Sequence, residues 1–257
     1  DDGGGIYVED TGGPFLIEDS VISGNTATQD GGGIYFYDPD ADINITRTTI
    51  SGNIAEGNNG RAPGGTIAAN GNGGGVYMYS ADSGGQYITD STISGNLAGR
   101  GGGIYFYDAD EPFAFVNSTV SGNSASQTGG GIAFYYSGDD TGRVAHSTVA
   151  NNIANRGGGI YAYTATVTVS RSLISGNTAA SSGNEVYATS VALASNYNLF
   201  GHDGEGNAQA FTNFTPSGTD ITATSDGTTP TALAAILTTT LADNDSTVTA
   251  GAPPGAV

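Results

Sequence analysis

Acidic side chains follow a recurring Gly-Gly-Gly-Ile-Tyr tract. Their regular spacing makes them the strongest candidates for metal ligands in this sequence. Carboxylates stacked one above another repel unless a cation or water intervenes, and oxygen-rich clusters suit Ca²⁺. The pattern therefore predicts weak Ca²⁺ binding, against the alternative of a solvated acidic ridge that keeps the protein soluble. No other cofactor is expected. Two register positions after the tract supply the candidate ligands, Asp10, Asp38 and Asp108 at the first and Asp40, Asp82 and Asp110 at the second.

Tyrosines form a second periodic set. They alternate with aliphatic residues in the same tract, so they share the outward face of one strand. Such a face suits stacking against sugars or packing against another copy of the chain. The alternative is that stacked tyrosines only stabilise the sheet, or lie beneath another segment. The members proposed as a binding face are Tyr35, Tyr37, Tyr77, Tyr79, Tyr105, Tyr107, Tyr161 and Tyr163, and Ala133 interrupts the first column.

Catalytic arrangements are not evident among the basic residues. The six arginines are scattered among the repeats without a consistent acidic partner, and His146 and His202 are isolated in sequence. In other repeats Asp, Arg or Asn holds the position of His146, which indicates a surface variant. We therefore expect no catalysis. The alternative is a polysaccharide-acting lyase or hydrolase whose site lies near Arg61.

The tract itself recurs at a fixed period, and this defines the elements that carry these residues. Exact copies start at Gly3, Gly31, Gly101 and Gly157, variants start at Gly73 (GGGVY) and Gly129 (GGGIA), and a decayed copy starts at Gly183. The period is 28 residues, interrupted by one 14-residue insertion. A second signature, Ser-[Thr/Val]-[Ile/Val]-Ser-Gly-Asn, precedes most copies. A repeat of this length indicates a solenoid.

Each repeat contains short alternating stretches, which predict two or three strands per coil. Unbroken apolar columns lie eight and three positions before the turn asparagine, as in Ile45 and Ile50. No segment has a 3.6-residue apolar period, so a leucine-rich repeat is excluded. The pattern predicts an all-β parallel β-helix of about 28 residues per coil, with equivalent strands roughly 4.8 Å apart.

Composition excludes several classes of protein. The net charge is −19, there is no lysine, and such a surface repels nucleic acid and anionic lipid. There is no cysteine, which rules out disulfides and thiolate metal sites. No stretch resembles a membrane span, so we expect no membrane insertion of this segment.

The alternation of GGGIY with STISGN resembles the repeats of bacterial secreted and surface proteins. Polymorphic outer-membrane protein repeats and choice-of-anchor surface proteins are the families it is similar to. The segment NYNLFGHDGEG, at 196–206, and the ending LADNDSTVTAGAPPGAV add to the likeness. The resemblance implies a right-handed parallel β-helix in an extracellular or cell-surface protein of a bacterium or archaeon, generally without known catalysis.

Three segments depart from the period. We expect a β-helix over 1–204, an insertion near 56–70 that projects from it, and a C-terminal cap or docking tail over 205–257. The chain starts within a repeat, so its first rung should lack a strand beneath it. The residues predicted to form this self-assembly end are Gly3, Gly4, Gly5, Ile6, Tyr7 and Val8.

These features favour a non-catalytic extracellular structural protein, either a filament subunit or a surface adhesin stalk. Its expected partners are other copies of itself, stacked end to end, and glycans. The alternatives are the polysaccharide-acting enzyme or a glycan-binding module.

Overall fold

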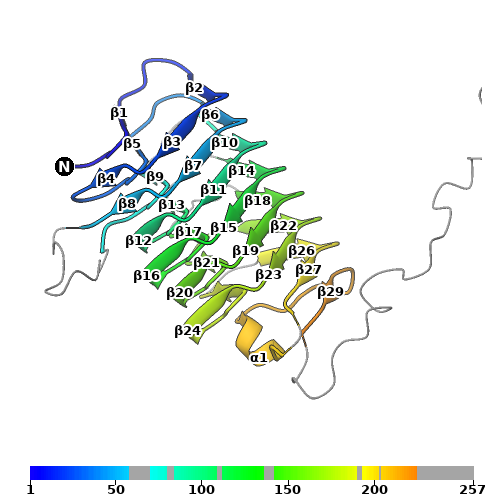
Figure 1. Cartoon of the computed structure of the whole chain (residues 1–257). Helices are drawn as coiled ribbons and strands as arrows, with labels where there is room; N and C mark the ends of the chain where they lie inside the picture. Colours follow the sequence, from blue (N-terminus) through cyan, green and yellow to red (C-terminus); the bar gives the residue numbers. More distant parts are fainter. Residues whose placement is uncertain are drawn as a thin grey trace, which may run out of the picture.

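The chain forms a single solenoid of short parallel strands (Figure 1). The computed structural model describes residues 1–57, 70–79, 84–108, 112–135, 142–189, 193–202 and 204–224. Within them, each regular coil carries four strands, one for each of four sheets that run along the axis. The sequence predicted two or three strands per coil. The strand that it did not predict belongs to sheet D and has two to five residues. At most one small alanine side chain per coil, such as that of Ala55 or Ala98, is fully buried in it.

Sheets A and B contain most of the aromatic residues of the core. Sheet A comprises β1 (Ile6–Glu9), β5 (Ile34–Tyr37), β9 (Val76–Tyr79), β13 (Ile104–Tyr107), β17 (Ile132–Phe134), β21 (Ile160–Ala162), β25 (Val186–Ala188) and β28 (Phe211–Thr212). Sheet B comprises β2 (Phe15–Glu18), β6 (Ile43–Thr46), β10 (Gln86–Thr89), β14 (Phe113–Val116), β18 (Gly142–Ala145), β22 (Val167–Ser170) and β26 (Leu193–Asn196).

Sheets C and D complete each coil. Sheet C comprises β3 (Val21–Ser23), β7 (Thr49–Ser51), β11 (Thr92–Ser94), β15 (Thr119–Ser121), β19 (Thr148–Ala150), β23 (Leu173–Ser175), β27 (Leu199–Phe200) and β29 (Ile221–Thr222). Sheet D comprises β4 (Thr26–Ala27), β8 (Ile54–Ala55), β12 (Leu97–Arg100), β16 (Ser124–Thr128), β20 (Ile153–Arg156) and β24 (Thr178–Ser182). The one helix in the described residues is α1 (Asn207–Ala210).

Like residues stack on like because the register between coils is exact in sheets A to C. Ile34 pairs with Val76, and Ile50 pairs with Ile93. These side chains are fully buried, and both apolar columns predicted from the sequence lie in this core. The prediction of an all-β parallel β-helix is confirmed.

An asparagine ladder closes the corner between sheets C and D. The amide nitrogen of Asn53 donates to Oδ1 of Asn96 at 3.0 Å, and Asn96 donates to Asn123 at 2.9 Å. The same amide nitrogen of Asn96 donates to the backbone oxygen of Ile50 at 3.0 Å. A buried polar corner is tolerated only when its groups are hydrogen-bonded in this way.

The glycine tract connects sheet D to sheet A, and each of its three positions excludes a side chain. Gly31 has a positive φ of 64°. A Cβ on Gly32 would lie 2.5 Å from the backbone oxygen of Gly74, and one on Gly33 would lie 3.0 Å from the amide nitrogen of Asn53. The tract therefore makes a tight corner between the two sheets.

The ends of the solenoid differ from the expected boundaries. Sheets A and C continue past residue 204, because β28 pairs with β25 and β29 pairs with β27. Residues 225–257, which hold most of the expected tail, lie outside the described residues. So do residues 58–69 of the insertion. The base of that insertion is closed by a hydrogen bond from Asn70 N–H to Glu56 O at 2.9 Å.

Candidate functional site

The outward face of sheet A carries two parallel columns of tyrosines. The inner column lies next to the glycine corner, and its rings stack at 4.8 Å for Tyr35 on Tyr77 and 5.1 Å for Tyr77 on Tyr105. The outer column lies further along the strands and is unbroken in the described residues, with ring separations from 4.7 to 5.6 Å. Its members are Tyr37, Tyr79, Tyr107, Tyr135 and Tyr163.

The two columns differ in exposure. In the inner column Tyr35, Tyr77, Tyr105 and Tyr161 are 5% exposed or less. The corner causes this burial, because a Cβ on Gly31 would lie only 2.4 Å from the Cβ of Tyr35. The outer column remains partly exposed. Of the proposed binding face, the outer residues therefore present most of the ring surface that a ligand could contact, and the inner residues are buried.

Ala133 interrupts the inner column between Tyr105 and Tyr161, as the sequence indicates. In the outer column of the same coil, Tyr135 lies 6.3 Å from the ring of Tyr105 in a tilted arrangement. Tyr135 therefore leans toward the space that a tyrosine at position 133 would fill. On the far side of the gap, Tyr161 stacks on Tyr187 at 5.2 Å.

A column of polar residues runs beside the tyrosines, at the last position before each glycine tract. We call it the rim column; its members are Asp2, Asp30, Asn72, Arg100, Thr128, Arg156 and Ser182. Parallel pairing places Arg100 beside Thr128, and Thr128 beside Arg156. In the sequence the arginines were interpreted as scattered. The signal that could have joined two of them is their shared position, because Arg100 and Arg156 each directly precede a Gly-Gly-Gly tract. These two tracts lie two coils apart, on either side of the coil that contains Ala133.

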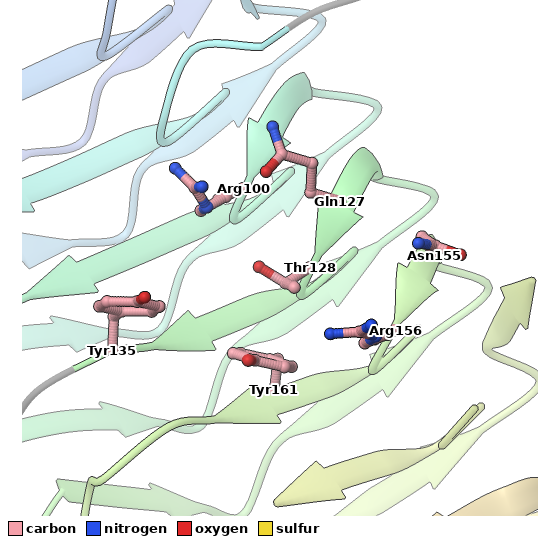
Figure 2. A pocket seen from close by; sticks show the side chains of 7 residues that line it. All are labelled: Arg100, Gln127, Thr128, Tyr135, Asn155, Arg156 and Tyr161. Carbon is pink, nitrogen blue, oxygen red and sulfur yellow. The ribbon is translucent and has the colours of Figure 1, made fainter. Parts of the chain in front are cut away.

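A hollow of about 280 Å³ opens between the rim column and the tyrosines at this point (Figure 2). Tyr135 and Tyr161 form one side, and Arg100, Thr128 and Arg156 form the other. Gln127 also lines it, at the place where β16 carries one residue more than its neighbours and the register shifts. Bulges of this kind redirect a side chain out of the ladder. The full lining is Arg100, Gln127, Thr128, Tyr135, Asn155, Arg156 and Tyr161.

The polar groups of the hollow are only partly satisfied within the described residues. The hydroxyl of Thr128 is buried without a hydrogen-bond partner. Nη1 of Arg100 makes one long contact, 3.5 Å, to Oδ1 of Asn72, and neither Arg100 nor Arg156 joins an ion pair in the described part of the chain. Burial raises the pKa of Tyr161, and Arg156 only partly opposes it, so this phenol stays neutral.

Comparison with known proteins places this fold. A family model described as the right-handed beta helix region matches residues 1–154, which is more than half of the chain. The chain belongs to the right-handed β-helix family. No curated protein and no solved structure matches it. The family match assigns the fold of this β-helix and carries no site residues.

The acidic ridge of this β-helix is only partly described. Asp10, Asp38 and Asp108 all have a positive φ near 50°, at the turn that follows sheet A. Asp82 and Asp110 lie outside the described residues. Among the described ridge residues, no three carboxylates approach one another within 4.8 Å. Ca²⁺ binding at the ridge stays a prediction.

The first rung pairs on one side only in the described residues. Strand β1 pairs with β5, from Ile6 with Ile34 to Glu9 with Tyr37. Ile6 and Val8 are partly buried against the core. Next to Ile6, a second hollow of about 260 Å³ lies among Gly5, Val21, Ile22 and Asn25.

The two histidines lie two coils apart, on opposite sides of sheet C. His146 is exposed, at the corner between sheets B and C, with a φ of 52°. This agrees with its interpretation as a surface variant. His202 follows β27 near the C-terminal end of the described solenoid, beside two glutamates. No described helix is long and apolar enough to cross a membrane.

Proposed function

We propose that this β-helix is a non-catalytic, extracellular binding scaffold that holds an acidic glycan against its tyrosine face. The observation that carries the proposal is the hollow between Arg100 and Arg156. Two of the six arginines in a chain of net charge −19 lie there, two coils or roughly 10 Å apart. A carboxylate or sulfate group is the ligand that a guanidinium binds best.

The tyrosines favour a sugar as the carrier of that anion. Tyr135, which is partly exposed, offers aromatic surface with a polar tip, which suits the apolar face of a sugar ring and its hydroxyl groups, and the buried Tyr161 lines the hollow beside it. The Thr128 hydroxyl and the amides of Gln127 and Asn155 supply further hydrogen-bonding groups. The volume is at the low end for a ligand pocket, so it suits one sugar unit of a chain that continues along the outer tyrosine column.

Among the described residues, the lining of the hollow contains no carboxylate, which supports binding over hydrolysis. A glycosidase needs two carboxyl groups across the scissile bond. A lyase remains the alternative enzyme, because an arginine can neutralise a uronate while a base removes a proton.

Binding should be measured by calorimetry on the full chain, with hyaluronan and polygalacturonate as uronate polymers, dextran sulfate as a sulfated polymer and dextran as a neutral one. The proposal expects binding of at least one anionic polymer and none of dextran. Arg156→Ala and Arg100→Ala should each weaken binding about 10- to 100-fold, the loss of a charged hydrogen bond. Arg143→Ala, an exposed arginine of sheet B, is the matched control.

Ala133→Tyr provides the sharper test, because it restores the residue found in neighbouring coils and fills the hollow. This variant should fold normally and lose binding. Equal binding by Ala133→Tyr and the wild type would overturn the proposal. Ultraviolet absorbance that rises with time from unsaturated sugar products would replace the binding scaffold with a lyase.

Self-association through the N-terminal rung is the second candidate function. Within the described residues β1 has a strand partner on one side only, and this and its partly buried apolar residues Ile6 and Val8 favour it. Ile6→Asp should reduce the sedimentation coefficient of any assembly, whereas Leu16→Asp, an exposed outward position on β2, should not. A variant that tests the docking tail should end at Thr224, because residues 206–224 contribute α1, β28 and β29 to the solenoid. A full chain that stays monomeric at high protein concentration would contradict self-association.

A further inference from the structure

Two glutamates and a histidine meet where the asparagine ladder stops, at the C-terminal end of the described solenoid. One oxygen or nitrogen of each of Glu185, His202 and Glu205 lies within 4.8 Å of the others. Within the described residues this is the one such group of potential metal ligands. None of its residues lines the hollow, so it is independent of the proposed glycan binding.

Glu185 occupies the third position of the decayed glycine tract. In the preceding coil a Cβ on Gly159 would lie 2.8 Å from the amide nitrogen of Asn177, so a side chain is excluded there. The carboxylate of Glu185 instead takes the place of the next ladder asparagine. It accepts hydrogen bonds from the amide of Asn177 at 2.6 Å and from the backbone N–H of Gly176 at 2.9 Å. These bonds fix its orientation, as outer-shell partners do for a metal ligand.

Glu205 is the unexplained member. Its side chain is 2% exposed, and neither carboxylate oxygen has a hydrogen-bond partner. The backbone turns through Gly201 and Gly204, both with positive φ, before it reaches this residue. A buried carboxylate that accepts no hydrogen bond is costly unless a proton or a cation neutralises it. The neighbouring carboxylate, that of Glu185, is fully buried and increases this cost.

Distances between the side chains match those around a single small ion. Nδ1 of His202 lies 3.3 Å from Oε2 of Glu205 and 3.6 Å from Oε1 of Glu185. Ligands bonded at about 2.1 Å in a tetrahedron are roughly 3.4 Å apart. His202 is about half exposed, so the ion would face solvent on that side.

We propose that Glu185, His202 and Glu205 bind one Zn²⁺ ion, which fastens the last coils of the solenoid together. One imidazole and two carboxylates suit Zn²⁺, whereas Ca²⁺ requires six to eight oxygen ligands. The ion neutralises the two buried carboxylates and joins the start of β25 to the segment between β27 and α1. The solvent-facing position is filled by water.

Zinc titration of the full chain, monitored by thermal unfolding, tests the proposal. Excess Ca²⁺ in all samples occupies the acidic surface. The midpoint of unfolding should rise with Zn²⁺ concentration and fall again with EDTA, because a ligand of the folded state stabilises it by mass action. Elemental analysis after gel filtration should give one zinc per chain.

His202→Ala should abolish the zinc-dependent shift and the bound zinc, and its partial exposure makes it safe for folding. His146→Ala is the matched control and should behave as the wild type. Glu205→Gln should also lose the zinc response, yet be at least as stable as the wild type without metal, because it removes an unpartnered buried charge. A midpoint that ignores Zn²⁺, or an unchanged response in His202→Ala, would overturn the proposal.

Discussion

The regular coils of this β-helix and the two places where the repeat breaks have opposite chemical character. Around Tyr77 and Asn96, the rings of the inner column stack and the ladder asparagines are hydrogen-bonded to their equivalents in the next coil. At Ala133 the repeat lacks its tyrosine, and at Glu185 it lacks its glycine. Near these two places the Thr128 hydroxyl and the Glu205 carboxylate are buried without a hydrogen bond to any described residue. In a solenoid, a single substitution per coil is enough to turn a structural position into a candidate site.

The largest expected effect is in the regular part, at the asparagine ladder. Asn96→Ala removes the acceptor of two donors from Asn53 and leaves buried N–H groups unsatisfied. We expect a loss of about 3–5 kcal/mol in the free energy of unfolding, because each unsatisfied buried group costs about 1–3 kcal/mol. Urea unfolding followed by circular dichroism measures it. Ser94→Ala, in the strand before, should cost far less.

Tyr77→Ala makes a second gap in the inner column, without arginines on both sides. Tyr77 is 3% exposed, so we expect a loss of about 3 kcal/mol, at the lower end for aromatic truncation. The rim residues beside that gap include Asp30, so the variant should gain no binding of acidic glycans. A second glycan per chain in calorimetry would show that a gap alone makes a site.

A smaller effect, when it is measured per unit of pH, is expected at Glu185 in metal-free protein. Burial, with the nearby Glu205 carboxylate and against the hydrogen bond from Asn177, raises the pKa of Glu185 to about 9. Because the folded-state pKa exceeds the unfolded one, the folded state binds the extra proton, and stability falls as pH rises between about 5 and 9. The slope is at most about 1.4 kcal/mol per pH unit. Unfolding in EDTA at several pH values measures it, and Glu185→Gln should flatten the slope.

The smallest effect concerns salt. Glycan binding at the half-open hollow should weaken several-fold as ionic strength rises to about 1 M, where the Debye length is only about 3 Å. Calorimetry at two salt concentrations checks this. Binding that is insensitive to salt would assign the affinity to the tyrosines and not to Arg100 and Arg156.

Repetition made the core predictable. The columns that contain Ile45 and Ile50 recur at one spacing, and only a parallel β-helix places them all inside. Sheet D was missed because its strands contribute little more than one alanine per coil. The burial of Tyr35 depends on the angle at the glycine corner, which no single position encodes.

Neither candidate site follows from the periodic pattern alone. Arg100 and Arg156 become neighbours of one hollow only once the coils are in register, although their shared place before the tract was visible. Glu185, His202 and Glu205 occur where the repeat decays, so no column identifies them. Residues that depart from the repeat therefore form sites when their register positions make them neighbours across coils.

The stacked outer tyrosines give this protein an optical signature. The centres of successive rings in this column, from Tyr37 to Tyr163, lie 4.7 to 5.6 Å apart. Three of the four successive pairs are within 14° of parallel. Transition dipoles at such distances couple, so the near-ultraviolet dichroism should contain a contribution from the column as a whole. The chain has no tryptophan to drain the excitation. Tyrosine spectroscopy can thus follow the alignment of successive coils without any label.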